Sequence, residues 1–182
     1  MIEKNLLVAG LPGVGKTTLM KKFVKESTHL HPVGFYTAEI REEGVRKGFE
    51  VIDLEGRSGI LSHVNIKSRY RVGRYKVDVS GFEDFLDGIP FFDPSSPVIM
   101  MDEIGKMECL SDKFVRMLKE ILDSEKWVIA TIALKGSGQI ARIKRRPDVK
   151  LFEMTPGNRD VLFSEILNVI SPKNAPLPGG DE

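Results

Sequence analysis

The chain has 182 residues, enough for one domain with a full hydrophobic core and too few for two sizeable domains. Its 27 Lys and Arg against 26 Asp and Glu leave a net charge of +1, which argues against nucleic acid or anionic lipid as a partner. No apolar run is long enough for a transmembrane helix, and we expect no export signal. The single cysteine, Cys109, excludes an intramolecular disulfide and favours a reducing compartment, so we expect a cytoplasmic protein.

The first predicted element is an apolar strand, Leu6–Ala9, followed directly by the sequence GLPGVGKTT. This sequence matches the phosphate-loop pattern G-x-x-x-x-G-K-[ST], in which backbone N–H groups, a helix N-terminus and a lysine attract phosphate oxygens. Lys16 is predicted to act on the β- and γ-phosphates, and the Thr17 hydroxyl to ligate Mg²⁺. We expect the whole loop to contact the nucleotide, namely Gly10, Leu11, Pro12, Gly13, Val14, Gly15, Lys16, Thr17 and Thr18.

The next segments change from helical to β character. Apolar residues at helical spacing predict a helix over 16–26, and aromatic and β-branched residues predict a strand over 33–40. Between about 41 and 80, short β-prone runs alternate with glycine-containing turns, which favours antiparallel hairpins. We therefore expect a β-rich insertion at the edge of a parallel sheet, followed by a short helix near 80–86.

Regular alternation of strands and helices returns after residue 96. The patterns predict strands over 97–101, 127–132 and 148–153, and helices over 113–122, 138–143 and 158–169. The fold class is therefore α/β: a mostly parallel sheet with helices on both faces and an antiparallel β-hairpin insertion. Residues 1–170 are predicted to form a single domain, and the Pro- and Gly-rich tail 171–182 is predicted to be disordered.

Two adjacent carboxylates follow the apolar strand near residue 100. Asp102 would lie at the carboxyl edge of the sheet, where α/β proteins bind ligands, and is predicted to hold Mg²⁺ through water. Glu103 beside it is predicted to be the general base that polarises the attacking water. The alternative is that this acidic pair is only a polar exit from the strand or a helix-capping turn.

Several further residues are weaker candidates. Thr131 could contact the γ-phosphate or the attacking water, or simply satisfy strand propensity. Arg46 and Arg142 are the arginines proposed to stabilise the transferring phosphoryl group. The alternative is that they are solvated, as charged residues at hairpin tips and helix ends usually are. No N-K-x-D or T-K-x-D sequence is present to read guanine, so base selectivity should be weak. Asn158 could line the base pocket or could be the N-cap of the last helix.

The segments GLPGVGKTTL, TAEIREEGVRKGFEVIDLEGRSGILSHV, VIMMDEIGKME and TPGNRD together resemble the THEP-type nucleoside triphosphatases, the family that includes the cancer-related nucleoside triphosphatase. The resemblance extends to about residue 170. It implies a three-layer α/β/α phosphate-loop fold with a RecA- and kinase-like core, and hydrolysis of nucleoside triphosphates with broad base tolerance and Mg²⁺. It also implies that the nucleotide contacts Gly10–Thr17 and Val98–Gly105.

Three functions remain open from the sequence. The first is a Mg²⁺-dependent nucleoside triphosphatase, in which water is the acceptor. The second is a small nucleoside or nucleotide kinase, in which Glu103 deprotonates an acceptor hydroxyl. The third is a nucleotide-dependent interaction module, which the near-neutral charge and the missing guanine motif disfavour. We expect a monomer whose partners are nucleoside triphosphates.

Overall fold

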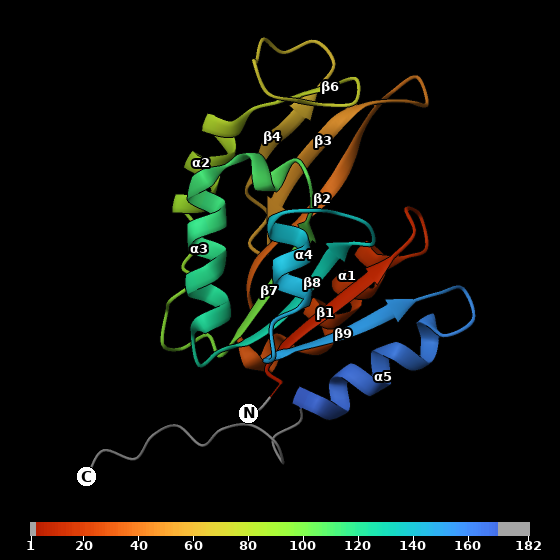
Figure 1. Cartoon of the computed structure of the whole chain (residues 1–182), viewed down its shortest axis with the longest axis vertical. Helices are drawn as coiled ribbons and strands as arrows, with labels where there is room; N and C mark the ends of the chain where they lie inside the picture. Colours follow the sequence, from red (N-terminus) through yellow and green to blue (C-terminus); the bar gives the residue numbers. More distant parts are fainter. Residues whose placement is uncertain (1–2, 171–182) are drawn as a thin grey trace.

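The computed structural model describes residues 3–170, and the predicted tail lies outside the described residues. A nine-stranded sheet runs through this part in the order β5-β6-β4-β3-β2-β7-β8-β1-β9 (Figure 1). Its parallel strands are adjacent: β2 (Val33–Glu42), β7 (Val98–Ile104), β8 (Trp127–Ala133), β1 (Asn5–Gly10) and β9 (Val149–Met154). The carboxyl ends of these strands therefore meet along one edge of the sheet.

The antiparallel strands continue the same sheet beyond β2. They are β3 (Val45–Asp53), β4 (Ser58–His63), β5 (Arg71–Val72) and β6 (Tyr75–Val77). Strand β2 pairs in parallel with β7 on one side and antiparallel with β3 on the other. Glu43 and Gly44 adopt positive φ at the β2–β3 turn, a backbone conformation in which glycine is unstrained. The antiparallel part is thus an extension of the main sheet. In Figure 1 the antiparallel strands lie in the upper part of the picture, above β1, β8 and β9.

Helices cover both faces of the sheet and give it two hydrophobic cores. On one face lie α2 (Val79–Asp87), α3 (Asp112–Asp123) and α4 (Gln139–Lys144), and on the other lie α1 (Lys16–Glu26) and α5 (Arg159–Ile170). Short 3₁₀ helices occupy Thr28–Leu30 and Glu108–Leu110. Alternate residues of β1 point to opposite cores, Leu7 to the first and Leu6 to the second. This arrangement confirms the predicted three-layer α/β/α fold.

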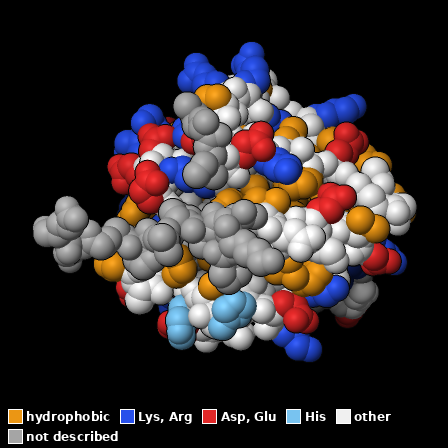
Figure 2. Space-filling view, turned by 90° about the horizontal axis from the view of Figure 1, so that it is seen from below, with side chains coloured by type: hydrophobic (Ala, Val, Ile, Leu, Met, Phe, Trp, Pro, Cys, Tyr) orange, Lys and Arg blue, Asp and Glu red, His pale blue; other side chains and the backbone are white. Residues whose placement is uncertain are grey.

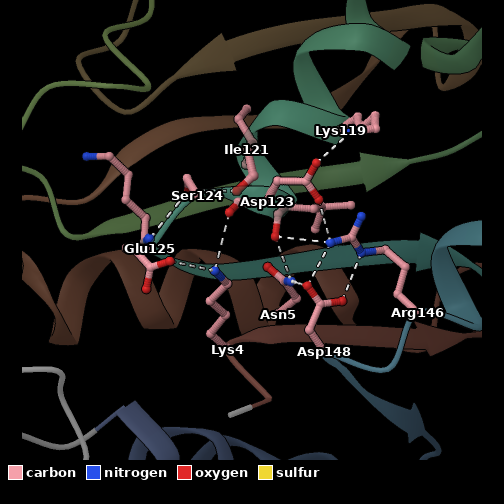
Figure 3. Close-up of polar contacts among 11 residues, drawn as sticks. Lys4, Asn5, Lys119, Ile121, Asp123, Ser124, Glu125, Arg146 and Asp148 are labelled. Atoms are coloured by element: carbon pink, nitrogen blue, oxygen red, sulfur yellow. Dashed lines mark hydrogen bonds and ion pairs between the residues drawn. The ribbon is translucent and has the colours of Figure 1, made fainter. Parts of the chain in front are cut away.

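A polar network ties the sheet together at the edge away from the phosphate loop (Figure 3). Arg146, which follows α4, donates to Asp148 at 2.7 Å and to Asp123 at 2.8 Å. Asn5 at the start of β1 donates to Asp148 at 3.1 Å and to the Leu122 carbonyl at 3.0 Å. The Arg146 guanidinium keeps the pKa of the Asp148 carboxyl below its usual value. These bonds join β1, β9 and the end of α3.

The surface is mixed in charge. Figure 2 shows basic and acidic side chains interspersed on the lower face, with apolar side chains between them. This pattern agrees with the nearly equal numbers of acidic and basic residues in the sequence. Within residues 3–170, no helix combines the length and the apolar character that crossing a membrane requires.

Candidate active site

The phosphate loop connects the end of β1 to the start of α1. All six residues of β1 are buried, so the strand fixes the start of the loop. Gly13 and Gly15 adopt φ of 78° and 110°, conformations that a side chain would strain. Lys16 is buried, and its ammonium donates to the carbonyls of Gly10 at 2.9 Å and Leu11 at 3.2 Å. The loop therefore carries a positive charge over a turn of backbone N–H groups.

The carboxylates of β7 lie at a bulge beside this loop. Met101 and Ile104 pair with Ala130 and Ile132 of β8, so β7 holds one extra residue between them. A bulge turns side chains away from the regular alternation, which is why bulges recur beside active sites. Strand β7 thus continues to Ile104, past the predicted end at Met101, and Asp102 and Glu103 occupy its irregular part.

Asp102 is almost fully buried and is held by two hydroxyls. Its oxygens accept a hydrogen bond from Thr17 at 2.6 Å and a short one from Thr131. Burial raises the pKa of Asp102, while these two hydrogen bonds and the charge of Lys16 lower it. The Thr17 hydroxyl in the first turn of α1 is thereby hydrogen-bonded to the Asp102 carboxylate, next to the phosphate loop.

Glu103 and Glu108 lie on either side of Gly105. A Cβ atom built on Gly105 would approach Glu108 Oε2 at 2.8 Å and Glu103 Oε1 at 3.0 Å, so a side chain here would require the two carboxyl groups to shift. Burial raises the pKa of Glu103. The positive charge of Lys16 lowers this pKa, and the negative charge of Asp102 raises it further. Burial also raises the pKa of Glu108 to about 8, with contributions from the charges of Glu103 and Asp102.

A cavity of about 920 Å³ connects these groups. The loop residues Gly10–Gly13 and Gly15–Thr18 form one wall, and Glu103 and Glu108 lie in the same lining. The cavity then extends over the antiparallel strands as far as Val72. Cations also surround it: Lys21, Lys106 and Lys135, besides Lys16 and Arg46.

The structure brings most of the predicted site residues to this cavity, but not all of them. Thr131 is fully buried on β8, and its hydroxyl donates to Asp102. Val14 is absent from the lining and packs against the second core. Arg142 is exposed on α4, because that helix turns Ile140 and Ile143 into the first core. Neither Thr131 nor Arg142 lines the cavity, and their predicted roles at the γ-phosphate and at the transferring phosphoryl group stay predictions.

Asn158 also lies outside the lining of the cavity. Its side-chain oxygen accepts from the Thr155 backbone N–H at 2.8 Å, and its side-chain nitrogen donates to the Glu153 carbonyl at 2.8 Å. Both bonds stabilise the turn between β9 and α5. The Asn158 side chain thus belongs to the helix-entry turn, where it bonds to residues that precede it and not to an N–H of α5, as an N-cap side chain would. Its place in the base pocket stays a prediction.

Glu108 is the main residue of the cavity that the sequence analysis missed. It lies in the segment DEIGKME, six residues after Asp102, but nothing in the local pattern indicates that its carboxyl is buried. The apolar lining residues Phe49, Leu61 and Val72 were also missed, because they come from strands that were predicted only as an insertion. Pairing between strands that are distant in the sequence brings these residues to the cavity, and no short sequence motif predicts that pairing.

Comparison with known proteins gives the family. A family model described as NTPase matches residues 5–167, which is most of the chain. The chain belongs to this NTPase family. It is 44% identical over 169 residues to a protein of Thermotoga sp. strain RQ2 named nucleoside-triphosphatase THEP1, covering 91% of this chain and 95% of the relative. It is 36% identical over 187 residues to the human cancer-related nucleoside-triphosphatase, covering 93% and 97%.

Solved structures of the family have the same fold. The crystal structure of THEP1 from Aquifex aeolicus superposes with a TM-score of 0.78 at 36% identity, covering 92% of this chain and 99% of that chain. The solution structure of a human cancer-related nucleoside triphosphatase gives a TM-score of 0.76 at 34% identity, covering 92% and 97%. The resemblance predicted from the sequence motifs is therefore confirmed.

Proposed function

We propose that this protein hydrolyses nucleoside triphosphates to diphosphates and phosphate, with Mg²⁺ and with little selectivity for the base. The observation that carries the proposal is the single cavity shared by the phosphate loop and Glu103. The names of the relatives support triphosphate hydrolysis. The absence of a guanine-reading motif supports the broad base tolerance.

The residues near the loop fit a magnesium ion. Thr17 and Asp102 meet at 2.6 Å beside the phosphate loop, and Mg²⁺ prefers oxygen ligands of these kinds. Among residues 3–170 no cluster of three or more His, Cys, Asp or Glu could hold a metal by itself. This suits Mg²⁺, which takes one or two carboxylates and completes its shell with water and phosphate oxygens. When bound, Mg²⁺ would neutralise charge on the β- and γ-phosphate oxygens.

The remaining groups act on the terminal phosphate and on water. Lys16 and the backbone N–H groups of Gly13–Thr18 bind the phosphate oxygens. Glu103 orients the attacking water and accepts its proton as the general base, since it lines the cavity and its carboxyl is not sealed off as that of Asp102 is. Thr131 holds Asp102 in position. Of the two candidate arginines only Arg46 lines the cavity, so Arg46 is the one proposed to stabilise the developing charge.

None of the relatives named above supports the kinase alternative, because they are named triphosphatases. The monomeric state stays a prediction, as do the cytoplasmic location and the lack of a nucleic-acid partner. The single cysteine supports the cytoplasmic location, and the near-zero net charge supports the lack of a nucleic-acid partner.

Phosphate release from each common triphosphate tests the proposal, with Mg²⁺ and with EDTA. Glu103→Gln should keep nucleotide binding and lose about 10²–10³ in turnover, as when one preorganised group is removed from an active site. Glu120→Gln is the matched control, because it makes the same change at an exposed position of α3 and should hydrolyse normally. A Glu103→Gln protein with full activity would refute the assigned base.

A further inference from the structure

The cavity extends beyond the residues that a triphosphate tail would contact. Its volume of about 920 Å³ lies in the upper part of the range for complete small-molecule sites. Part of its lining belongs to neither the phosphate loop nor the acidic residues. We call this part the distal compartment, and it is formed by Arg46, Phe49, Leu61, Val72 and Met107.

The order of strands places the distal compartment beyond the terminal phosphate. This step rests on the proposed function. The phosphate loop follows β1, the carboxylates that would face the terminal phosphate lie on β7, and β2, β3 and β4 come next along the sheet. Phe49 lies on β3 and Leu61 on β4. A triphosphate held by the loop with its end at Glu103 therefore leaves the apolar residues of the distal compartment free, and only Arg46 is shared with the reacting phosphate.

Four of the five residues that form the distal compartment are apolar. Leu61 is buried, whereas Phe49, Val72 and Met107 are each only partly buried and pack against the first core. The Phe49 ring is fixed edge-on against Tyr75, with ring centroids 5.4 Å apart. An apolar wall that stays partly open inside a cavity favours a ligand with an apolar body.

The rim of the compartment carries excess positive charge. The Glu39 carboxylate is shared between Arg41 at 2.6 Å and Arg46 at 2.8 Å. Arg46 also donates from Nε to the Tyr75 hydroxyl at 2.8 Å, and Arg74 donates to that hydroxyl at 3.1 Å. Two guanidinium groups thus share one carboxylate, and the guanidinium of Arg74 lies next to that of Arg46 at the Tyr75 hydroxyl. Among the described residues the second terminal nitrogen of Arg46 makes no hydrogen bond, so it is available to an anion.

We propose that the distal compartment binds a second small molecule, with a flat apolar body and an anionic group, at the same time as the triphosphate. The apolar body packs on Phe49, Val72 and Met107, and the anionic group pairs with Arg46. Because this ligand occupies Arg46 and not the phosphate loop, it lowers the turnover of the triphosphate without raising its KM.

The probe for this site is 8-anilinonaphthalene-1-sulfonate, a fluorescent aromatic sulfonate. It is titrated into the full chain alone and with saturating Mg²⁺ and a nonhydrolysable ATP analogue. We expect one molecule bound per chain in both cases, and inhibition of phosphate release that is noncompetitive with the triphosphate. Displacement of the probe by the ATP analogue would overturn the proposal, because the compartment would then hold part of the nucleotide.

Val72→Glu places a negative charge inside the compartment and should weaken probe binding at least tenfold. Val161→Glu is the matched control, since it makes the same change at an exposed position on α5 and should bind the probe normally. If the Val72→Glu protein does not fold, the milder Val72→Thr variant replaces it in the test, and it should weaken binding of the probe severalfold. Binding that no Val72 variant alters, or that Val161→Glu weakens equally, would contradict the proposal.

Lys16→Ala separates the two proposals. It should lose binding of the ATP analogue and still bind the probe. Probe binding without nucleotide binding in the wild type would count against the proposed function alone, whereas nucleotide binding without probe binding would count against the distal compartment alone.

Discussion

Thr131→Val tests whether a buried hydroxyl holds the Asp102 carboxylate in place. Thr131 is fully buried and donates to Asp102, which is itself only 1% exposed. Valine has nearly the same shape, so the substitution removes the donor and leaves no cavity. A hydrogen bond to a charged group contributes about 1.5–3 kcal/mol, and we expect the free energy of unfolding at pH 7 to fall by about 2 kcal/mol.

Urea denaturation measures this loss. A slope of about 2 kcal/mol per molar urea would lower the unfolding midpoint by about 1 M. Residues that orient a metal ligand typically account for about 10- to 100-fold in metal affinity. The Mg²⁺ concentration for half-maximal phosphate release should therefore rise by a similar factor.

Thr131→Ser is the control, because it keeps the hydroxyl and loses only a methyl group. It should retain the Mg²⁺ dependence of the wild type. If Thr131→Val and Thr131→Ser have equal Mg²⁺ dependence, the hydroxyl does not position Asp102 and the reasoning fails.

Other variants test the site and its support. Glu108 has its pKa raised to about 8, so the folded chain binds the proton more tightly than the unfolded chain, and stability should decline by about 1.4 kcal/mol per pH unit between about pH 5 and 8. Glu108→Gln should remove this slope in thermal melts, and an unchanged slope would count against a buried proton. Arg146→Ala should lower the free energy of unfolding by about 2 kcal/mol at pH 7, since it leaves Asp148 without its guanidinium partner. The pKa of Asp148 is lowered in the folded state, so this loss should shrink as the pH falls below about 4, and a loss independent of pH would be inconsistent with the ion pair. Asn158→Ala should leave the KM values for ATP and GTP within about twofold, because its side chain bonds only to the turn, and a base-dependent rise in KM would restore it to the base pocket.

The sequence was sufficient where function depends on residues adjacent in the chain. The spacing of Gly10, Gly15 and Lys16 predicts the phosphate loop because one strand–turn–helix unit forms it entirely. The apolar run before Asp102 likewise predicts a strand that brings a carboxylate to the loop, although not the bulge that continues β7 to Ile104.

The sequence was insufficient where the role of a residue depends on packing between distant segments. The burial of Glu108 and the apolar lining by Phe49 require the pairing of β2, β3 and β4. The assignments of Arg142 and Asn158 rested on chemical type, and the structure directs the first to solvent and the second into a turn. Residue type alone does not fix the direction of a side chain.

A crystal structure with Mg²⁺ and a nonhydrolysable ATP analogue tests the central claim most directly. We expect the phosphates against Gly13–Thr18, the metal beside Thr17 and Asp102, and the terminal phosphate facing Glu103. A triphosphate bound anywhere else, or a terminal phosphate turned away from Glu103, would contradict the account.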